Sequence, residues 1–349
     1  MKYILLILGA VIYATGIDQV PSVSENDKEI ICFVYHRVGD ARYPTTNTSI
    51  KDFESHLSYL TKNKFRVLNF SDAIDYLHSD KPAEKIAVIT VDDGYKSFYK
   101  NGLPLLKKYK LPSTLFINTA SVGGGDMMDW KQIEDAIGNG VEIGNHTHSH
   151  AFFLNLDESQ RYKSFREEIE LSQSIIKKNL DITPVVFTFP YGEFDLEMKK
   201  IVKEAGFKVA AAQNSGVVFS GTDMLMCPRF PMSEAYSSPE KFAEKAAMKA
   251  LRIVKVSPEN FLLGENKRPL LTLTFENDEL RTDQLQCFVQ GGECTLNVVE
   301  KNDKQVTVTV QASKAISGRR RTLYTVTVPD KKGRWHWYSH LWINPGVKE

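Results

Sequence analysis

The sequence predicts an α/β protein, a distorted (β/α) barrel of about seven strands followed by an all-β sandwich. First, apolar runs alternate with amphipathic segments of helical spacing between residues 28 and 248, which is typical of parallel strands covered by helices. Second, seven or eight such runs can be counted, and a closed or nearly closed barrel suits them better than an open sheet. Third, short strands without intervening helices follow to the end of the chain.

The predicted strands of the first region are nearly continuous apolar runs, as expected of strands buried on both faces. They lie at residues 29–38, 85–94, 113–120, 141–150, 185–195, 208–213 and 224–232. Helices are expected between them because apolar residues recur at helical spacing, as Phe53, Leu57 and Leu60 do. The expected helices lie at residues 49–63, 70–79, 97–110, 130–140, 157–180, 195–207 and 238–255.

The two ends of the chain differ from the barrel. Residues 1–16 combine Lys2, an apolar run and small residues, which is the pattern of a secretory signal peptide. The run is short for a transmembrane span and offers no Cys for a lipid anchor, and an uncleaved membrane anchor is the alternative. We therefore expect a secreted or periplasmic protein. At the other end, residues 257–349 are predicted to form the β sandwich.

The chain contains four cysteines, and in a secreted or periplasmic protein they could form disulfides, because disulfides persist outside the cytoplasm. Cys287 and Cys294 flank a short stretch centred on Gly-Gly, and we expect a disulfide near the turn of a hairpin. Cys32 and Cys227 lie in two predicted strands. They form a second disulfide if those strands are neighbours, and the equal alternative is a pair of buried free thiols.

The charge balance excludes one class of partner. The chain of 349 residues carries 44 Lys or Arg and 43 Asp or Glu, a formal net charge of +1. No strong field would draw such a protein to nucleic acid or to an anionic membrane. We therefore expect no nucleic-acid partner.

Polar residues gather where the predicted strands end. His36 follows the first strand, Asp92 and Asp93 the next, a histidine-rich loop another, and Pro190 with Tyr191 a fourth. Active sites of α/β barrels lie at the C-terminal ends of the strands. Four independent segments therefore predict one site at that end of the barrel.

The histidine-rich loop, residues 144–150, suggests a metal site. His146 and His150 are four residues apart and suit a shared ligand face, whereas His148 would point elsewhere. Two histidines and one strand-end carboxylate form a familiar catalytic zinc set with open positions for water and substrate. Taken alone, the loop and the Asp-Gly pair also fit a solvated polar loop and an ordinary turn.

These residues resemble the motifs of the polysaccharide deacetylases, the NodB-type carbohydrate esterases of family four. The TVDDG at residues 90–94 resembles the first motif, T-F-D-D-G, and the HTHSH at residues 146–150 resembles the second, H-[ST]-x-x-H. The FPYG at residues 189–192 resembles the third, R-x-P-Y. The resemblance covers about residues 28–232, with the motifs in the family's order and spacing.

The resemblance implies roles for individual residues. Asp93, His146 and His150 would bind the metal, and Asp92 would be the catalytic base. The backbone N–H of Tyr191 would help to hold the oxyanion, and Pro190 beside it would contact the substrate.

The chain departs from the third motif at its arginine, where Thr188 stands. The orientation of Asp92 is therefore open. Arg229 is a candidate substitute near the substrate, and an ordinary surface arginine is the alternative.

The histidine that protonates the leaving amine comes late in most of the family, but here only His336 and His340 follow Tyr191, both in the β region. His36 precedes the other motifs, an order that resembles the permuted subgroup acting on poly-β-1,6-N-acetylglucosamine in biofilms. This resemblance assigns His36 as the general acid, and it would place Cys32 beside Cys227. His56 and His78 lie in predicted helices and are expected at the surface.

The sequence thus predicts a secreted, metal-dependent hydrolase that removes N-acetyl groups from an N-acetylglucosamine polysaccharide and releases acetate. Zinc is the expected metal, and cobalt, nickel or iron could also occupy such a ligand set. Polysaccharide synthesis or export machinery is a candidate partner. An O-acetyl esterase acting on xylan or exopolysaccharide, and a polysaccharide-binding protein without activity, are the alternatives.

Two aromatic features have both a binding and a structural interpretation. Trp130 would wall the acetyl pocket or simply begin a helix on the core. Trp335 and Trp337 share one face of a strand and could stack on sugar rings, although such a strand more often closes a sandwich.

Overall fold

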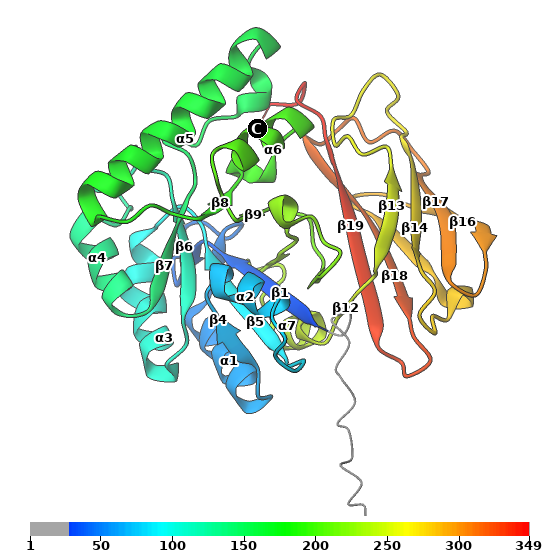
Figure 1. The fold of residues 1–349 in the computed structure, drawn as a ribbon, viewed down its shortest axis with the longest axis horizontal. Helices are drawn as coiled ribbons and strands as arrows, with labels where there is room; N and C mark the ends of the chain where they lie inside the picture. The colour runs from blue at the N-terminus through cyan, green and yellow to red at the C-terminus, as the bar shows by residue number, and fades with distance from the viewer. Residues whose placement is uncertain (1–27, 349) are drawn as a thin grey trace, which may run out of the picture.

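The computed structural model describes residues 28–348, and the predicted signal peptide lies outside them. Two regions lie side by side in Figure 1: a curled sheet covered by helices, and a β sandwich that carries the C-terminal strands. Among the described residues, no helix has both the length and the apolar character needed to cross a membrane.

The curled sheet of the first region follows the predicted alternation of strands and helices. Its central path runs in the order β10 (Val218–Phe219), β1 (Glu29–Tyr35), β5 (Ile86–Val91), β6 (Ser113–Ile117), β7 (Val141–Asn145), β8 (Val186–Thr188), β9 (Val209–Ala211). Neighbouring strands from β1 to β9 are parallel, and β10 alone on this path is antiparallel. The prediction of a distorted barrel of about seven strands is confirmed.

The barrel closes through the segment that follows β10. Cys227 forms an isolated parallel β-bridge with Ala211 at the end of β9, and β11 (Phe230–Pro231) pairs with β1 in parallel. A short strand, β4 (Arg66–Leu68), adds to β5 on the outside of this path. Residues 227–231 therefore form the seam between the first and last parallel strands, and they place Arg229 inside it.

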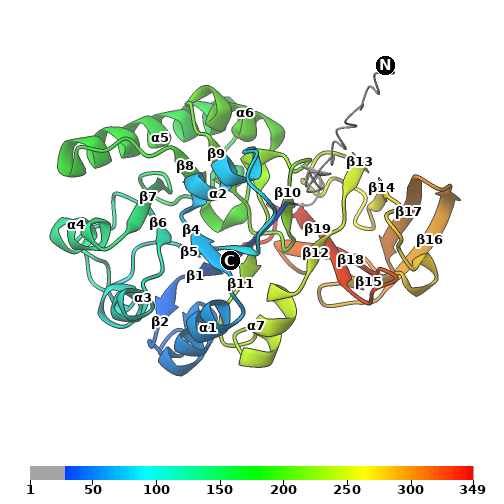
Figure 2. The same cartoon turned by 60° about the horizontal axis from the view of Figure 1, so that its bottom comes forward.

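Helices cover the outer face of the sheet, as Figure 2 shows most clearly. They are α1 (Ile50–Lys62), α2 (Phe70–Leu77), α3 (Leu103–Tyr109), α4 (Trp130–Gly138), α5 (Glu158–Leu180), α6 (Leu196–Glu204) and α7 (Pro239–Ala246). The sequence accounts for their starts; Asp129, for example, accepts from the backbone N–H of Gln132 in a capping box. A small pair, β2 (Arg37–Val38) and β3 (Asn47–Thr48), lies between β1 and α1.

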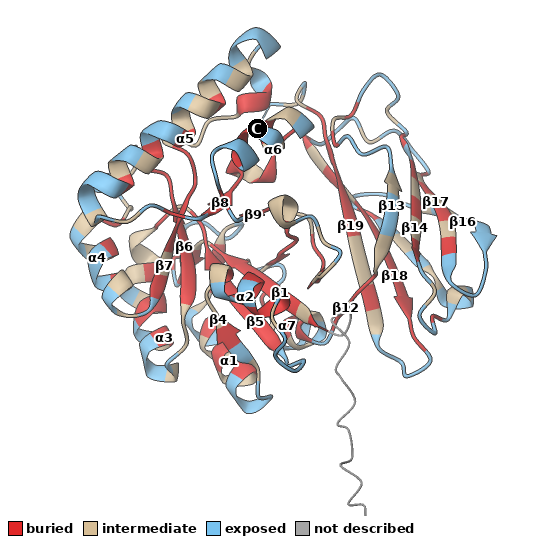
Figure 3. Cartoon of the chain, viewed as in Figure 1, coloured by how far each residue is buried: buried red, intermediate tan, exposed pale blue. Residues whose placement is uncertain are grey.

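The β region is a sandwich of two four-stranded sheets. One sheet contains β12 (Lys249–Ala250), β19 (Trp335–Ile343), β18 (Arg321–Pro329) and β15 (Gln286–Val289). The other contains β13 (Ile253–Ser257), β14 (Leu270–Glu276), β17 (Gln305–Ala312) and β16 (Cys294–Lys301). Buried residues alternate with partly exposed residues along β14 and β17, which Figure 3 colours red and tan, and the buried side chains form the core between the sheets.

The predicted disulfide Cys287–Cys294 is present and links β15 to β16. The second candidate disulfide is absent: Cys32 and Cys227 are buried free thiols. They share one apolar cluster around β1 and the seam, so the predicted proximity of their strands holds without a covalent bond.

Two local predictions are wrong. The helix expected at residues 238–255 ends at Ala246, because the chain turns there to contribute β12 and β13 to the two β sheets. His56 was expected at the surface but has no exposed area. It lies on the inner side of α1, where its ring nitrogens contact the Tyr35 hydroxyl and the Ser237 carbonyl and its ring stacks on Phe242. His78 is exposed as expected.

Candidate active site

Strand ends bring the predicted polar residues to one edge of the barrel. His36 follows β1, Asp92 and Asp93 follow β5, and His146 follows β7. The backbone N–H of Asp92 donates to the carbonyl of Tyr35 at 2.9 Å, so the β1 and β5 ends lie side by side. Register explains this convergence, because parallel strands end at the same side of a sheet.

Three side chains form a cluster with the geometry of a metal site. The Nε2 atoms of His146 and His150 each lie 3.5 Å from Oδ1 of Asp93 and 3.0 Å from each other. Ligand atoms held tetrahedrally at the usual zinc distances are separated by roughly 3.4 Å. Among the described residues, the group of side chains placed to hold a metal ion consists of Asp93, His146 and His150.

The surroundings of His146 fit a metal ligand. Its Nδ1 lies 2.8 Å from the carbonyl oxygen of Thr188, which can only accept, so Nδ1 carries the hydrogen. The lone pair on Nε2 therefore faces Asp93 and His150, as in a metal site whose histidine is oriented by a backbone carbonyl. His148 does not join the cluster, since its Nδ1 lies 2.8 Å from the hydroxyl of Thr119.

Asp92 is held by a buried arginine. Arg229 donates from Nη1 to one carboxylate oxygen at 2.8 Å and from Nη2 to the other at 2.9 Å. The same guanidinium also donates to the hydroxyls of Thr90 and Thr188, at 3.0 and 2.9 Å. Thr188, which stands where the family motif has its arginine, thus helps to hold an arginine that comes from the seam.

Arg229 has no exposed surface, so it is neither the surface residue of one alternative nor a group that can reach substrate. Its contacts fit the other interpretation, a substitute for the motif arginine that orients Asp92.

Electrostatics keep both carboxylates ionised. Burial raises the pKa of Asp92, but the charge and hydrogen bonds of Arg229 outweigh burial and leave the pKa below its ordinary value. Burial also raises the pKa of Asp93. The hydrogen bond with His146 and the nearby His36 outweigh burial and leave this pKa below its ordinary value. Burial lowers the pKa of His150 to about 4, which leaves the neutral ring that a metal requires.

Backbone strain is concentrated in this site. Eight residues other than glycine have positive φ in the described part of the chain. Four of them are Asp93 at φ 73°, Thr147 at 64°, His150 at 57° and Tyr191 at 58°. Such conformations are unfavourable for residues with a Cβ, and they persist where the surrounding structure enforces them, most often at functional sites.

Comparisons with known proteins agree with this geometry. The sequence profile of the polysaccharide deacetylase family matches residues 79–210, which include both aspartates, His146, His150 and Tyr191. This chain carries a polysaccharide deacetylase domain. His36 and Arg229 lie outside the matched residues, one on each side.

Named relatives and solved structures extend the comparison. The poly-β-1,6-N-acetyl-D-glucosamine N-deacetylase of Staphylococcus aureus is 25% identical over 215 residues, which are 58% of this chain and 73% of the relative. The structure of IcaB from Ammonifex degensii matches with a TM-score of 0.55 and 25% identity, over 63% of this chain and 96% of IcaB. The deacetylase PplD of Streptococcus pyogenes, solved with acetate, shares the fold: TM-score 0.57, 19% identity, 62% of this chain and 98% of PplD.

Other predicted site residues of the deacetylase domain have distinct surroundings. His36 is close enough to both aspartates to lower their pKa values, and it lines the large cleft beside the site. Pro190 is buried at the start of a single helical turn. Trp130 packs against the barrel core as the first residue of α4, which favours its structural interpretation.

A link from the β region to the deacetylase site was not predicted. Arg320 donates from Nε and Nη2 to the two carboxylate oxygens of Glu193, both at 2.7 Å, and both side chains are buried. Arg321 adds a third contact to Glu193 at 3.0 Å. Glu193 directly follows the turn that contains Tyr191, so the β region anchors that turn.

The same arginine also supports the turn through aromatic rings. The Arg320 guanidinium lies 4.5 Å from the ring centre of Phe152, and Phe152 stacks on Tyr191 with centres 3.6 Å apart. Tyr191 in turn packs against the ring of His150 at 4.3 Å. The only signal in the sequence is the arginine run at residues 319–321, because Glu193 and Arg320 lie too far apart for any local pattern.

Proposed function

We propose that the chain is a secreted, metal-dependent hydrolase that removes N-acetyl groups from a polysaccharide containing N-acetylglucosamine. The observation that carries this proposal is the cluster of Asp93, His146 and His150 beside a second aspartate, Asp92, held by Arg229. The relatives named for N-deacetylation of poly-β-1,6-N-acetyl-D-glucosamine support a polymer of that kind. The signal-peptide pattern supports action outside the cytoplasm.

Zinc is the metal we propose, because two neutral imidazoles and one carboxylate suit it and leave positions for substrate and water. When bound, the cation supplies Lewis-acid chemistry that polarises the acetyl carbonyl and makes water more acidic. The three proposed ligands come from two strand ends and a strained loop.

Each remaining residue has one proposed task. Asp92, ionised and oriented by Arg229, accepts the proton of the attacking water. The backbone N–H of Tyr191 donates to the oxyanion that forms at the acetyl carbon. His36 then gives a proton to the sugar nitrogen as the C–N bond breaks, and acetate leaves.

An ester substrate is the main alternative, because the same ligand cluster could serve an O-acetyl esterase. Amide hydrolysis needs a protonated leaving nitrogen, whereas an ester needs less help from an acid. The position of His36 beside Asp92 and Asp93 therefore favours the amide. A polysaccharide synthesis or export system remains a proposed partner.

The test is acetate release from poly-β-1,6-N-acetylglucosamine oligomers by protein lacking residues 1–16. The protein is assayed stripped of metal, restored with zinc, and as Asp92→Asn. We expect release only with zinc, and a loss of roughly a thousandfold in the variant. Release from acetylated xylan but from none of the amide oligomers would replace the proposal with the esterase.

A further inference from the structure

A cleft of about 810 Å³ lies between the deacetylase barrel and the β region. From the barrel, His36, Met232 and Lys241 are among the residues that line it. From the β region, Phe288 and Arg319 do so. The cleft therefore begins at the proposed general acid and has one wall from each region.

Cations outnumber carboxylates along this cleft. Arg320 and Arg321, which also line it, are engaged with Glu193. Lys245 and the single carboxylate Glu244 form an ion pair at 3.4 Å. The other charged side chains on the described walls are the cations Lys241, Arg319 and Lys348. The cleft is thus positive, although the whole chain carries a formal net charge of only +1.

Exposed aromatic rings face the same cleft. Three aromatic side chains are exposed among the described residues, and two of them, Tyr236 and Phe288, line this cleft from opposite walls. Their exposed fractions are 48% and 52%, so about half of each residue is open to solvent. Aromatic faces of this kind pack on the apolar faces of sugar rings.

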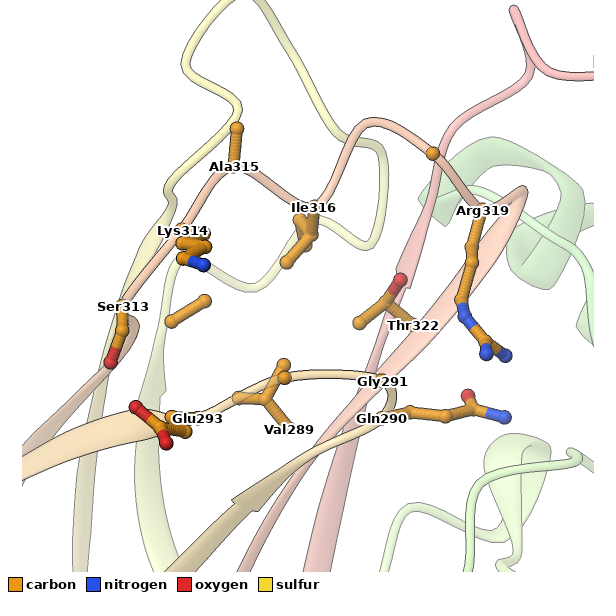
Figure 4. A pocket seen from close by; sticks show the side chains of 13 residues that line it. Val289, Gln290, Gly291, Glu293, Ser313, Lys314, Ala315, Ile316, Arg319 and Thr322 are labelled. Atoms are coloured by element: carbon orange, nitrogen blue, oxygen red, sulfur yellow. The ribbon is translucent and has the colours of Figure 1, made fainter.

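A second cavity of about 490 Å³ lies next to the cleft in the β region. The two cavities share the lining residues Val289, Gln290, Gly318 and Arg319. Figure 4 labels Gln290 and Arg319 among the side chains that line this second cavity, together with Lys314 and Glu293. Arg319 therefore lies where the two cavities adjoin.

We propose that this cleft binds an N-acetylated polysaccharide that carries negatively charged groups, and that the β region supplies the wall selecting them. The proposal rests on the proposed deacetylase function, whose active site the cleft adjoins, and it replaces the neutral polymer of the named relatives with an anionic polymer that also contains N-acetylated sugars. Carboxylate on uronic acid units and phosphate in the polymer backbone are the two sources of such charge, and Arg319 suits either.

A positive cleft also favours release of product. Each deacetylated unit gains an ammonium group at neutral pH, and cations on the walls repel it. A neutral polymer gains nothing from these walls before reaction, whereas an anionic polymer is held until its amines appear.

The test measures binding of three hexasaccharides by calorimetry at low salt. They are a hyaluronan oligomer, which alternates glucuronate with N-acetylglucosamine, an oligomer of N-acetylglucosamine 1-phosphate, and neutral chitohexaose. We expect at least one anionic oligomer to bind about tenfold tighter than chitohexaose, with the difference disappearing near 0.5 M salt. The anionic oligomer that binds tighter identifies the source of charge.

The variant is Lys241→Gln with Arg319→Gln, two exposed residues on opposite walls. It should remove most of the anionic preference, measured as the ratio of anionic to neutral affinity. The control, Lys131→Gln with Lys178→Gln, removes the same charge from exposed positions on α4 and α5 and should leave the ratio unchanged.

Equal binding of all three oligomers, or equal loss in variant and control, would overturn the proposal. The deacetylase function is judged separately by acetate release. Release from neutral oligomers without anionic preference leaves that function standing and removes only the inference.

Discussion

The barrel and the β region differ in what they bury. The barrel encloses the ion pair of Arg229 and Asp92, with no exposed surface on either side chain. The sandwich encloses a core built mainly from alternating apolar residues such as Leu271, Leu273 and Phe275 of β14. A buried ion pair contributes little net stability, whereas apolar burial contributes most of it. The barrel therefore uses burial for a polar pair of the candidate site, whereas the sandwich uses it for apolar packing.

The largest expected effect comes from removing the buried cation of the barrel, Arg229. Arg229→Met should lower the free energy of unfolding by about 3–5 kcal/mol, because Asp92 is left as an uncompensated buried charge. Denaturant titration measures the loss. Adding Asp92→Asn to the same chain should recover part of the stability but no acetate release. A single variant as stable as the parent would show that the pair is not desolvated.

A matching substitution in the β region removes apolar volume from the core of the sandwich. Leu273→Ala should lower the free energy of unfolding by about 3 kcal/mol, because it empties space between the two sheets. Acetate release per folded molecule should stay at the parental level at a temperature where the variant is folded. A large change in that rate would mean that the sandwich core itself tunes the site.

Zinc should stabilise the folded protein through the proposed metal site of the barrel. At about 100 times its dissociation constant, the ion should raise the free energy of unfolding by about 2.7 kcal/mol. His150→Ala removes one ligand and should abolish most of this gain, while His148→Ala, whose ring faces Thr119, should keep it. Thermal unfolding with and without zinc gives the comparison. An equal gain in both variants would place the metal elsewhere.

The contact between the two regions should matter less for stability than for rate. Arg320→Met should cost about 2 kcal/mol, less than Arg229→Met, because Arg321 still contacts Glu193. We expect kcat to fall roughly tenfold with KM little changed, since the turn carrying Tyr191 loses its anchor.

Arg334→Met is the matched control for that variant. It breaks a more exposed arginine–aspartate pair of the β region, with Asp330, that touches no deacetylase residue. If both variants slowed the reaction equally, Arg320 would have no special role in positioning Tyr191.

The smallest expected effect concerns a buried histidine of the β region. Burial lowers the pKa of His340 to about 3, well below the value of about 6.5 for an unfolded chain. Between these values the unfolded chain binds the extra proton, so stability falls as pH falls below 6.5. His340→Phe should weaken this dependence by about 1 kcal/mol between pH 6.5 and 5.5 in denaturant titrations. An unchanged pH dependence would mean that the folded chain accepts the proton.

The predicted and unpredicted parts of the site differ in how far apart their residues lie in sequence. Asp92, Asp93, His146 and His150 could be predicted because each pair sits in one short motif at a strand end. Arg229 could be named only as a candidate, and the contact of Glu193 with Arg320 was not predicted, because both contacts join segments more than a hundred residues apart.

Burial separates the correct from the incorrect residue predictions. Helical spacing predicted α1 but did not show that His56 lies on its buried side. The contacts that bury His56, with Tyr35 and Ser237, leave no local signal in the sequence, so His56 was expected at the surface. The helix predicted through residue 255 was too long for a related reason. Residues 249–250 become β12 only by pairing with β19 near the end of the chain, and residues 253–257 become β13 by pairing with β14.

The seam of the barrel joins two distant parts of the chain. Asp92 and Arg229 are 137 residues apart in sequence, and the arginine comes from the segment that closes the barrel. A chain cut after residue 228 would contain Asp93, His146 and His150 but not the cation that contacts Asp92. The proposed activity therefore requires the closed barrel and not only the three proposed metal ligands.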